Sequence, residues 1–381
     1  MQTLDVLKAA RSVVIKIGTA LIAREDADGV RTEWLTALAQ DVAALRKQGK
    51  NVTIISSGGI ALGRSALGIS PQTPPQKIPL EHKQAASSVG QFRVFHGYHE
   101  AFSAQELTCA QILLTMTETE NRAMHLNARA TLQTLLDKGI VPIINENDTV
   151  STAEIRFGDN DRLAARVAQM INADVVVLLS TIDGLYTANP YKNPGAQHIP
   201  IVETLGDEHV SMAGDALPGL STGGMKSKIE AAQTALRAGI PLLIADGRAE
   251  HALDNIFNNA EMRCTLFMAS AHEKNARKSW IHAHLKPKGA VYVDSGALQA
   301  LKNGKSLLPV GVKKVEGVFA RGDAVEIRAL EDGQRLGIGL SAYSSKDAGD
   351  IMGKKSADIL EILGYAGRDE LIHRNDMVLE V

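Results

Sequence analysis

The sequence predicts an α/β protein with an open, mainly parallel sheet covered by helices, followed by a small β-rich domain. Two observations favour this fold class. Over the first two-thirds of the chain, short apolar runs rich in Val and Ile alternate with stretches of helical length, as in sheets whose strands are buried on both faces. After about residue 264, the apolar segments become shorter and glycines separate them, which is typical of small β domains.

Four short, continuous apolar runs are expected to be strands of the parallel sheet. They are Val13–Ile17, Val52–Ser56, Ile140–Ile144 and Asp174–Leu179. In open α/β sheets, ligands bind where loops leave the carboxyl ends of the strands. The loops that follow these four runs are therefore the places where functional residues are expected.

Helices are expected between these runs. The stretches with helical length or periodicity are Thr32–Gln48, Leu80–Ala104, Glu118–Leu136, Asp161–Ile171 and Met225–Ala238. The proline-rich segment Ser70–Pro79 is expected to be an extended loop, because proline disrupts helix interiors.

The change of pattern suggests two domains joined by a connector. We place the first domain at residues 1–264, the connector at 265–285 and the β-rich domain at 286–381. The connector has mixed polarity and a basic cluster. The second domain contains the short segments VYVDSG, SLLPVGV, AVEIRAL and RLGIGLSAY, with one helix near Ser295–Leu301.

Composition narrows the class of protein. The chain has 41 Lys plus Arg against 43 Asp plus Glu, so it lacks the basic excess expected of a general binder of nucleic acid or anionic membranes. No apolar run approaches the length of a membrane span, and the charged N-terminus does not resemble a secretory signal. The 2 cysteines lack CxxC spacing, which makes a disulfide framework or zinc-cysteine site unexpected. A cytoplasmic protein is the expectation.

Three glycine-containing loops carry residues suited to phosphate. Lys16 ends the first apolar run beside Gly18, where backbone N–H groups and an ammonium group could meet an anion. Ser56-Ser57-Gly58-Gly59 leads into a helix, and so does Thr222–Lys228, whose lysines are unusual in a first helical turn. Each loop alone also has a plain structural explanation, as a surface lysine or as a helix cap beside a glycine turn.

The strongest local signal is a pair of polar clusters. Seven of the ten residues in the segments 145–149 (NENDT) and 157–161 (FGDND) are Asn, Asp or Glu. Such residues favour turns and caps, but two dense clusters exceed what one turn and one cap require. We interpret them as donors and acceptors for an amino-acid-like substrate and as organisers of the lysines.

Taken together, these motifs resemble the amino-acid kinase family. The resemblance rests on VVIKIGTALI, TIISSGGIALG, QAASSVGQ, VPIINENDTVST, FGDNDRLAA, LLSTIDGLYT and STGGMKSK, in that order, followed by a domain that looks like a PUA domain. It spans nearly the whole chain. It implies a three-layer α/β/α sandwich with a mainly parallel sheet, plus a small β-rich PUA-like domain.

The combination of NEND, GDND and a PUA-like tail resembles the family members that act on glutamate. The resemblance implies transfer of a phosphoryl group from ATP, with Mg²⁺, to the side-chain carboxylate of L-glutamate, as the first step of proline biosynthesis. That carboxylate is ionised near neutral pH, so no general base is required and no His is expected to be essential.

The resemblance also implies roles for individual residues. Lys16 and Lys228 would bracket the transferred phosphoryl group, while Asp161 or its neighbour Asp159 would orient them and contact Mg²⁺ through water, with no direct metal ligand. Ser57, Asp148 and Asn160 would hold glutamate, supported by Asn145. The nucleotide site would comprise Lys16, Ser180, Thr181, Thr222, Gly223, Gly224, Met225, Lys226, Ser227 and Lys228. Ser180-Thr181 stands where the family often has Thr-Asp, which puts one polar contact to the nucleotide in question.

Partners follow from the resemblance as well. It implies proline as a feedback inhibitor, a homo-oligomer (dimer or tetramer) and hand-over of the product to glutamyl phosphate reductase. Two alternatives stay open: a kinase for aspartate, acetylglutamate or another small acid, and an RNA-binding or RNA-modification accessory protein led by the PUA-like tail. Residues 286–381 hold 14 basic and 14 acidic residues, so nucleic acid binding is not expected.

Overall fold

The computed structural model describes residues 2–24, 29–151, 159–212, 224–270 and 286–380, without the side chains of Asp159 and Asn375. The chain divides into two compact units. Unit 1 comprises residues 1–120 and 128–274, and unit 2 comprises residues 121–127 and 275–381. Within the described parts of the chain, no helix has both the length and the apolar character that a membrane crossing needs.

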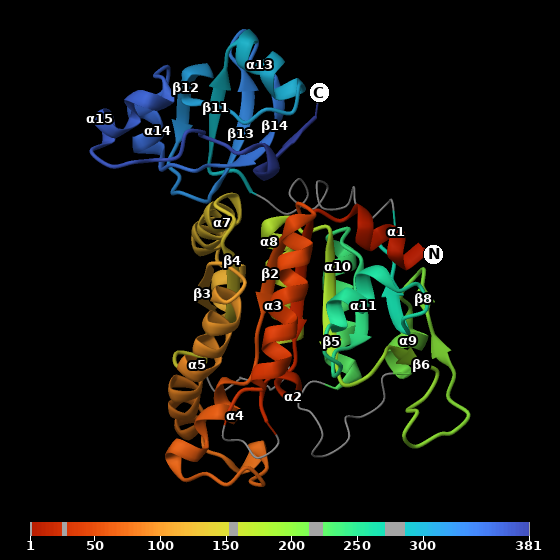
Figure 1. Ribbon diagram of the computed structural model, residues 1–381. Helices are drawn as coiled ribbons and strands as arrows, with labels where there is room; N and C mark the ends of the chain where they lie inside the picture. Colours follow the sequence, from red (N-terminus) through yellow and green to blue (C-terminus); the bar gives the residue numbers. More distant parts are fainter. Residues whose placement is uncertain (1, 25–28, 152–158, 213–223, 271–285, 381) are drawn as a thin grey trace. The chain divides into compact units, whose positions relative to one another are not determined.

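Unit 1 is built on an eight-stranded sheet of order β3-β4-β2-β1-β5-β9-β10-β8 (Figure 1). The pairs from β3 to β9 are parallel, and β10 runs antiparallel to β9. The four predicted strands are β1 (Ser12–Ile17), β2 (Asn51–Ile55), β4 (Val141–Glu146) and β5 (Val175–Ser180). The fold class predicted from the sequence is confirmed.

Several strands were not anticipated. They are β3 (Cys109–Leu114), β9 (Leu242–Asp246), β10 (Cys264–Phe267) and the short β6 (Leu185–Tyr186), β7 (His198–Ile199) and β8 (Ile201–Val202). Because β10 pairs with β9, the sheet of unit 1 continues through Phe267, past the residue 264 at which we expected the first domain to end.

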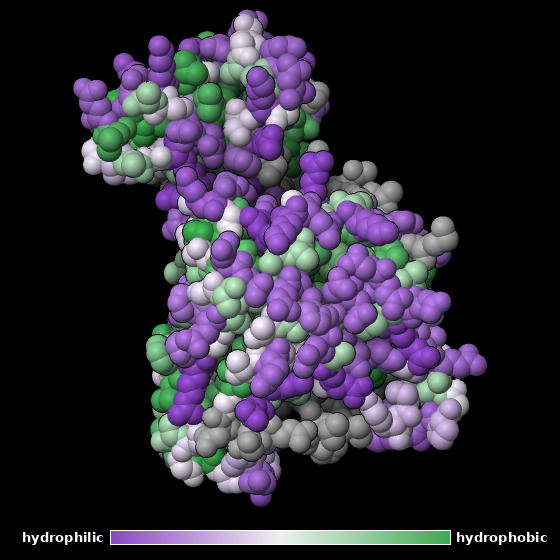
Figure 2. All heavy atoms as spheres, in the orientation of Figure 1, coloured by the Kyte–Doolittle hydropathy of each residue, from purple (hydrophilic) through white to green (hydrophobic). Residues whose placement is uncertain are grey.

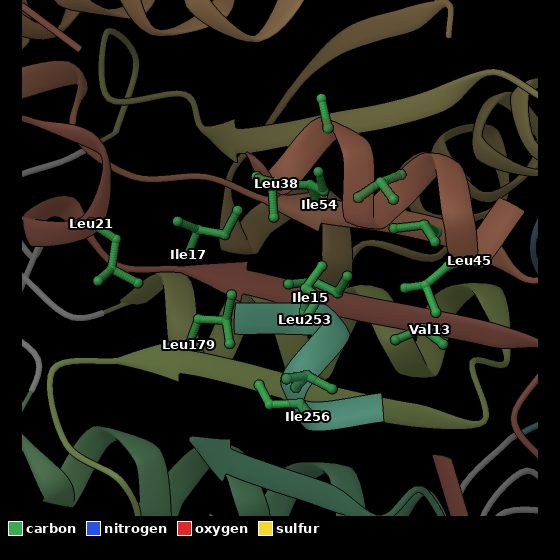
Figure 3. Close-up of a cluster of buried hydrophobic side chains, with 14 of the residues drawn as sticks. Val13, Ile15, Ile17, Leu21, Leu38, Leu45, Ile54, Leu179, Leu253 and Ile256 are labelled. Atoms are coloured by element: carbon green, nitrogen blue, oxygen red, sulfur yellow. The ribbon is translucent and has the colours of Figure 1, made fainter. Parts of the chain in front are cut away.

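Two apolar cores cover the two faces of this sheet, because successive strand residues point to opposite faces. Val13, Ile15 and Ile17 of β1 belong to the first core, together with side chains of α3 (Thr32–Lys47) and α11 (Ala252–Asn258) (Figure 3). Side chains of α5 (Leu80–Ser103) complete this core. Val14 belongs to the second core, with α8 (Asp159–Ile171) and α10 (Met225–Arg237). Hydrophilic residues dominate the outward face of the unit over α3 (Figure 2).

The helices agree with the predicted ranges except at two places. The expected helix Glu118–Leu136 is two helices, α6 (Met116–Glu120) and α7 (Arg122–Asp137). The side chain of Asn121 accepts a hydrogen bond from the Met124 N–H, as an N-cap does, and so starts a new helix. The segment Ser70–Pro79 includes a short 3₁₀ helix at Pro75–Lys77, which prolines at its start permit. The remaining helices of unit 1 are α1 (Gln2–Ala9), α2 (Thr19–Ile22), α4 (Gly59–Gly63) and α9 (Asp207–Met212).

Close packing of α4 on α5 depends on glycine. A Cβ atom at Gly63 would lie 1.7 Å from the Ala86 carbonyl oxygen, and one at Gly90 would lie 1.8 Å from the Gly59 carbonyl oxygen. Real atoms cannot approach so closely, so the two backbones touch only because both positions lack side chains. This contact brings α5 to the loop that follows β2.

Unit 2 contains a five-stranded sheet of order β12-β11-β13-β14-β15, in which only the β11–β13 pair is parallel. The strands are β11 (Gly289–Val293), β12 (Val312–Gly317), β13 (Ala324–Ala329), β14 (Arg335–Leu340) and β15 (Met377–Leu379).

The predicted helix of unit 2 is present as α13 (Ser295–Lys302), capped by the Asp294 side chain. The expectation of a single helix is wrong, because α14 (Ser345–Ile351) and α15 (Ile359–Leu363) follow. Their lengths of 7 and 5 residues offer too little periodicity to detect in the sequence. SLLPVGV is not a strand before Val312: it forms one isolated bridge at Leu307 and a 3₁₀ helix at Pro309–Gly311.

Candidate active site

The carboxyl ends of six parallel strands, β3, β4, β2, β1, β5 and β9, lie at one edge of the sheet. From β1 the chain first builds β2, β3 and β4 on one side, and then β5 and β9 on the other. The edge between β1 and β5 is therefore a topological switch point, the usual ligand site of such sheets. Lys16, near the end of β1, and Ser180, at the end of β5, flank it.

A buried carboxylate lies between two lysines at this edge. Lys16 shares its face of β1 with Val14, so its side chain points toward α8 and α10. Its Nζ lies 2.7 Å from Asp161 Oδ1, and Lys228 Nζ lies 2.9 Å from Asp161 Oδ2. Asp161 belongs to α8 and Lys228 to α10, and the exposed fraction of the Asp161 residue is 0%.

Burial and neighbouring charges both shift the pKa values of these groups. Burial alone would raise the pKa of Asp161, but Lys16 and Lys228 outweigh it and hold that pKa well below its usual range. Burial lowers the pKa of Lys16, and Lys228 adds to this effect, while Asp161 opposes both. The carboxylate is thus firmly ionised and holds two ammonium groups near each other. With both lysines charged, the three groups leave one positive charge in excess, which suits an anion.

A third side chain secures the carboxylate. Ser227 Oγ donates a hydrogen bond of 2.7 Å to Asp161 Oδ2. The sequence motif placed Ser227 in the nucleotide loop but did not indicate that it holds Asp161. Ser227 lies in the first turn of α10, one residue before Lys228. It therefore belongs to the predicted nucleotide segment and also reaches Asp161.

Three predicted substrate residues form a connected group beside this centre. Asn160 Nδ2 lies 3.0 Å from the Ser56 carbonyl oxygen, 2.9 Å from Ser57 Oγ and 3.2 Å from Asn145 Oδ1. Gly58, with φ +101°, permits the sharp turn that carries Ser57 from β2 into α4. The structure therefore brings together Ser57 from the loop after β2, Asn145 from the end of β4 and Asn160 from the start of α8.

Asp148 comes after β4 and its partner comes from α5. Ser87 Oγ donates a hydrogen bond of 2.5 Å to Asp148 Oδ2. Burial raises the pKa of Asp148, and the Ser87 hydrogen bond partly offsets this rise. Ser87 and Gln91, which accepts from Asn145, lie in the QAASSVGQ motif, but neither was assigned a role, because the motif alone does not show which residues they contact.

The predicted nucleotide residues are partly described. Gly224 and Met225 open α10, Lys228 is buried, and Lys226 is exposed. Ser180 is the last residue of β5, and its carbonyl accepts from the Gly247 N–H at 2.9 Å, which joins the ends of β5 and β9. Thr181 is half-buried beside it. Thr222, Gly223 and the side chain of Asp159 lie outside the described residues.

A charged pair beside the β5 loop was also not anticipated. Arg248 Nε lies 3.0 Å from Asp246 Oδ1 and 2.9 Å from Oδ2, at the end of β9. Hydrogen bonds and charge from Arg248 lower the pKa of Asp246 against the raising effect of burial. No grouping of three His, Cys, Asp or Glu side chains suited to a metal ion occurs in the described part of the chain.

Comparison with family models agrees with this architecture. Residues 11–246 match the amino acid kinase family, and residues 289–363 match the PUA domain. The chain belongs to the amino acid kinase family, with a PUA domain after the catalytic domain.

Full-length relatives narrow the assignment. The chain is 51% identical over 377 residues to the glutamate 5-kinase of Rhodopseudomonas palustris strain BisA53, covering 99% of this chain and 98% of that protein. Glutamate 5-kinases of Paramagnetospirillum magneticum and Gluconobacter oxydans are 49% and 50% identical, each over 98% of this chain and over 99% and 97% of their own lengths. Within its family, the chain groups with the glutamate 5-kinases.

Solved structures were compared too. A structure of isopentenyl phosphate kinase aligns with a TM-score of 0.47 at 15% identity, covering 68% of this chain and 100% of that one. A UMP kinase from Bacillus anthracis aligns with a TM-score of 0.49 at 14% identity, over 69% of this chain and 97% of its own.

Proposed function

We propose that this chain transfers the γ-phosphoryl group of ATP to the side-chain carboxylate of L-glutamate, forming glutamyl 5-phosphate and ADP. Relatives about half identical over nearly the whole chain carry the name glutamate 5-kinase. The amino acid kinase domain supports the same reaction class. The reaction is the first step of proline biosynthesis.

One observation carries the proposal most strongly: Asp161 is buried between Lys16 and Lys228. A transferring phosphoryl group spreads negative charge over its oxygens while an anionic carboxylate approaches it. Two ammonium groups held by one carboxylate offer a net positive charge at fixed positions, so little reorganisation is needed when the reaction occurs.

The chemistry needs no proton transfer. An oxygen of the glutamate carboxylate forms a bond to the γ-phosphorus, and the bond between that phosphorus and the ADP oxygen breaks. Both reacting groups are anionic, so the protein contributes by placing them in line and neutralising charge. Lys16 and Lys228 would flank the moving phosphoryl group, and Asp161 would keep both lysines in place.

The proposed glutamate site is formed by Ser57, Asn145, Asp148 and Asn160. These side chains include both hydrogen-bond donors and acceptors, which an amino acid with two carboxylates and one ammonium group requires. The proposed nucleotide site adds Ser180, Thr181 and residues 222–228, of which Met225–Lys228 form the start of α10, where a helix N-terminus favours phosphate.

Mg²⁺ is proposed to arrive with ATP. When bound, it would neutralise phosphate charge, and Asp161 or Asp159 would contact it through water. Both oxygens of the buried Asp161 carboxylate already pair with lysines, which argues against its being a direct ligand of Mg²⁺.

Regulation and assembly remain predictions from the family. We propose proline as a feedback inhibitor that overlaps the glutamate site, a homo-oligomer formed through the kinase domain, and hand-over of the product to glutamyl phosphate reductase. A cytoplasmic location is part of the same proposal.

Trapping the product tests the function. Purified protein is incubated with ATP, Mg²⁺ and hydroxylamine, with glutamate, aspartate or N-acetylglutamate as acceptor. We expect an acyl hydroxamate only with glutamate, because an acyl phosphate reacts readily with hydroxylamine. Product formed only with another acid would overturn the substrate assignment and favour a different kinase of the same fold.

A further inference from the structure

Helix α5 enters the proposed glutamate site through two side chains. Ser87 and Gln91 are four residues apart and so lie on one face of the helix. Ser87 donates to Asp148, and Gln91 Oε1 accepts a hydrogen bond of 2.6 Å from Asn145 Nδ2. Each therefore holds a residue of the proposed glutamate site.

The orientation of the Asn145 amide follows from a partner that can only donate. The backbone N–H of Glu146 lies 2.9 Å from the Asn145 side-chain oxygen. That atom must be the oxygen, so the other end of the amide is the NH₂ group and requires an acceptor. Gln91 supplies that acceptor, and the exposed fraction of Asn145 is only 2%, which leaves little access for water as a replacement.

The orientation of Asn160 depends in turn on Asn145. The NH₂ group of Asn160 is fixed by the Ser56 carbonyl and the Asn145 oxygen, both of which can only accept. The chain of contacts thus runs from Gln91 through Asn145 to Asn160 and Ser57. Without Gln91, Asn145 would have to rotate to satisfy its NH₂ group, and Asn160 would lose an acceptor.

A glycine makes room for this arrangement. A Cβ atom at Gly59 would lie 2.9 Å from Ser87 Oγ and 3.1 Å from Gln91 Oε1. A side chain there would press on both polar groups. The close packing of α4 on α5 therefore places Ser87 and Gln91 within reach of the loops after β4.

We propose that Ser87 and Gln91 of α5 are positioning residues for the amino-acid substrate, acting through Asp148 and through the Asn145–Asn160 pair. This inference rests on the proposed function, since it names residues that set the affinity for glutamate. It predicts effects on the glutamate site that leave the nucleotide site intact.

Kinetics of Gln91 variants test the proposal. Gln91→Met removes the acceptor at similar length, whereas Gln91→Glu keeps an acceptor for Asn145. We expect the KM for glutamate to rise about 10-fold in Gln91→Met, with the KM for ATP within about twofold of wild type, and to recover most of its wild-type value in Gln91→Glu. Gln133→Met, which removes an exposed Gln–Asp hydrogen bond on α7, is the matched control and should leave both constants unchanged.

Two results would overturn the proposal. One is an unchanged KM for glutamate in Gln91→Met; the other is a parallel rise of both KM values with a lower melting temperature, which would indicate a merely structural role. Ser87→Ala removes a single oxygen and serves if Gln91→Met does not fold: the KM for glutamate alone should rise. Wild-type protein without glutamate-dependent product would overturn the proposed function together with this inference, whereas an active enzyme with unchanged KM values would overturn this inference alone.

Discussion

At the scale of single residues, several partners hold the Asp161 carboxylate at the same time. Two lysines and Ser227 approach its two oxygens, and it is fully buried. Breaking a buried ion pair from one side leaves an uncompensated charge and is strongly destabilising. The arrangement therefore fixes the positions of the lysine ammonium groups in advance of substrate binding.

Removing either ammonium group should slow the reaction. We expect Lys16→Ala and Lys228→Ala each to lower kcat by about 10²-fold or more, equivalent to roughly 3 kcal/mol of barrier, because each removes a fixed positive charge beside the phosphoryl group. Lys47→Ala, at an exposed lysine of α3, is the control and should keep wild-type rates. Steady-state rates at saturating ATP and glutamate measure the effect, and unchanged kcat in either active-site variant would refute the phosphate roles.

The raised pKa of Asp148 predicts a pH dependence. If the Asp148 carboxylate binds the substrate ammonium group, kcat/KM for glutamate should fall as pH drops through a pKa above the ordinary value of 3.8. Ser87→Ala removes the hydrogen bond that lowers this pKa, so its acidic limb should lie at higher pH than that of wild type. Glutamate itself titrates in the same way in the wild-type and Ser87→Ala measurements, so any difference comes from the protein. Acidic limbs at the same pH in the two proteins would contradict the role of Asp148 in glutamate binding.

At the scale of elements, the contact between α4 and α5 determines where the proposed glutamate site lies. Both helices present glycine at the closest point, so their backbones meet directly. The sheet places the remaining side chains, because alternate residues of a strand point to opposite faces. Lys16 thus lies on the face of α8 and α10, whereas Asn145 shares its face of β4 with Val141 and Ile143 and meets α5.

A methyl group at this helix contact should damage both stability and glutamate binding. Gly90→Ala would place a Cβ atom 1.8 Å from the Gly59 carbonyl oxygen, so α5 must shift. We expect a loss of about 1–3 kcal/mol in the free energy of unfolding and a higher KM for glutamate, measured by denaturant titration and steady-state kinetics.

The matched control is Gly349→Ala in α14, where a Cβ atom would meet nothing within 4 Å. That substitution should be neutral or stabilising by up to about 1 kcal/mol, because alanine favours helix. Equal losses in the two variants would contradict the steric explanation for Gly90.

Uniform burial made four strands recognisable in the sequence, although the short strands β9 and β10 are also buried and were missed. The runs that became β1, β2, β4 and β5 are buried on both faces, so their apolar character is continuous. The edge strand β3 is only partly buried and was missed for that reason. Asn145, Asp148 and Asn160 were predicted as site residues because they cluster in the sequence. Ser87 and Gln91 lie in the QAASSVGQ motif, but their contacts with Asp148 and Asn145 were not predicted, because they depend on the α4–α5 packing.

At the scale of the whole molecule, the chain combines an amino acid kinase domain with a PUA domain of nearly balanced charge. Basic side chains on the sheet of unit 2 have acidic neighbours, as in the Lys314–Glu316, Arg328–Glu326 and Arg335–Glu380 pairs. Paired charges offer little net attraction to a phosphate backbone. These ion pairs favour the expectation that this domain does not bind nucleic acid, which stays a prediction.

The central claim is that the glutamate carboxylate itself attacks the γ-phosphorus. Glutamate labelled with ¹⁸O in its side-chain carboxylate tests this directly, in the presence of ATP, Mg²⁺ and hydroxylamine. The bridging oxygen of the acyl phosphate would come from glutamate, and hydroxylamine would then release phosphate by attack at the carbonyl carbon. We predict one ¹⁸O atom in each released phosphate. Unlabelled phosphate would contradict the account, because it would mean that water and not glutamate receives the phosphoryl group.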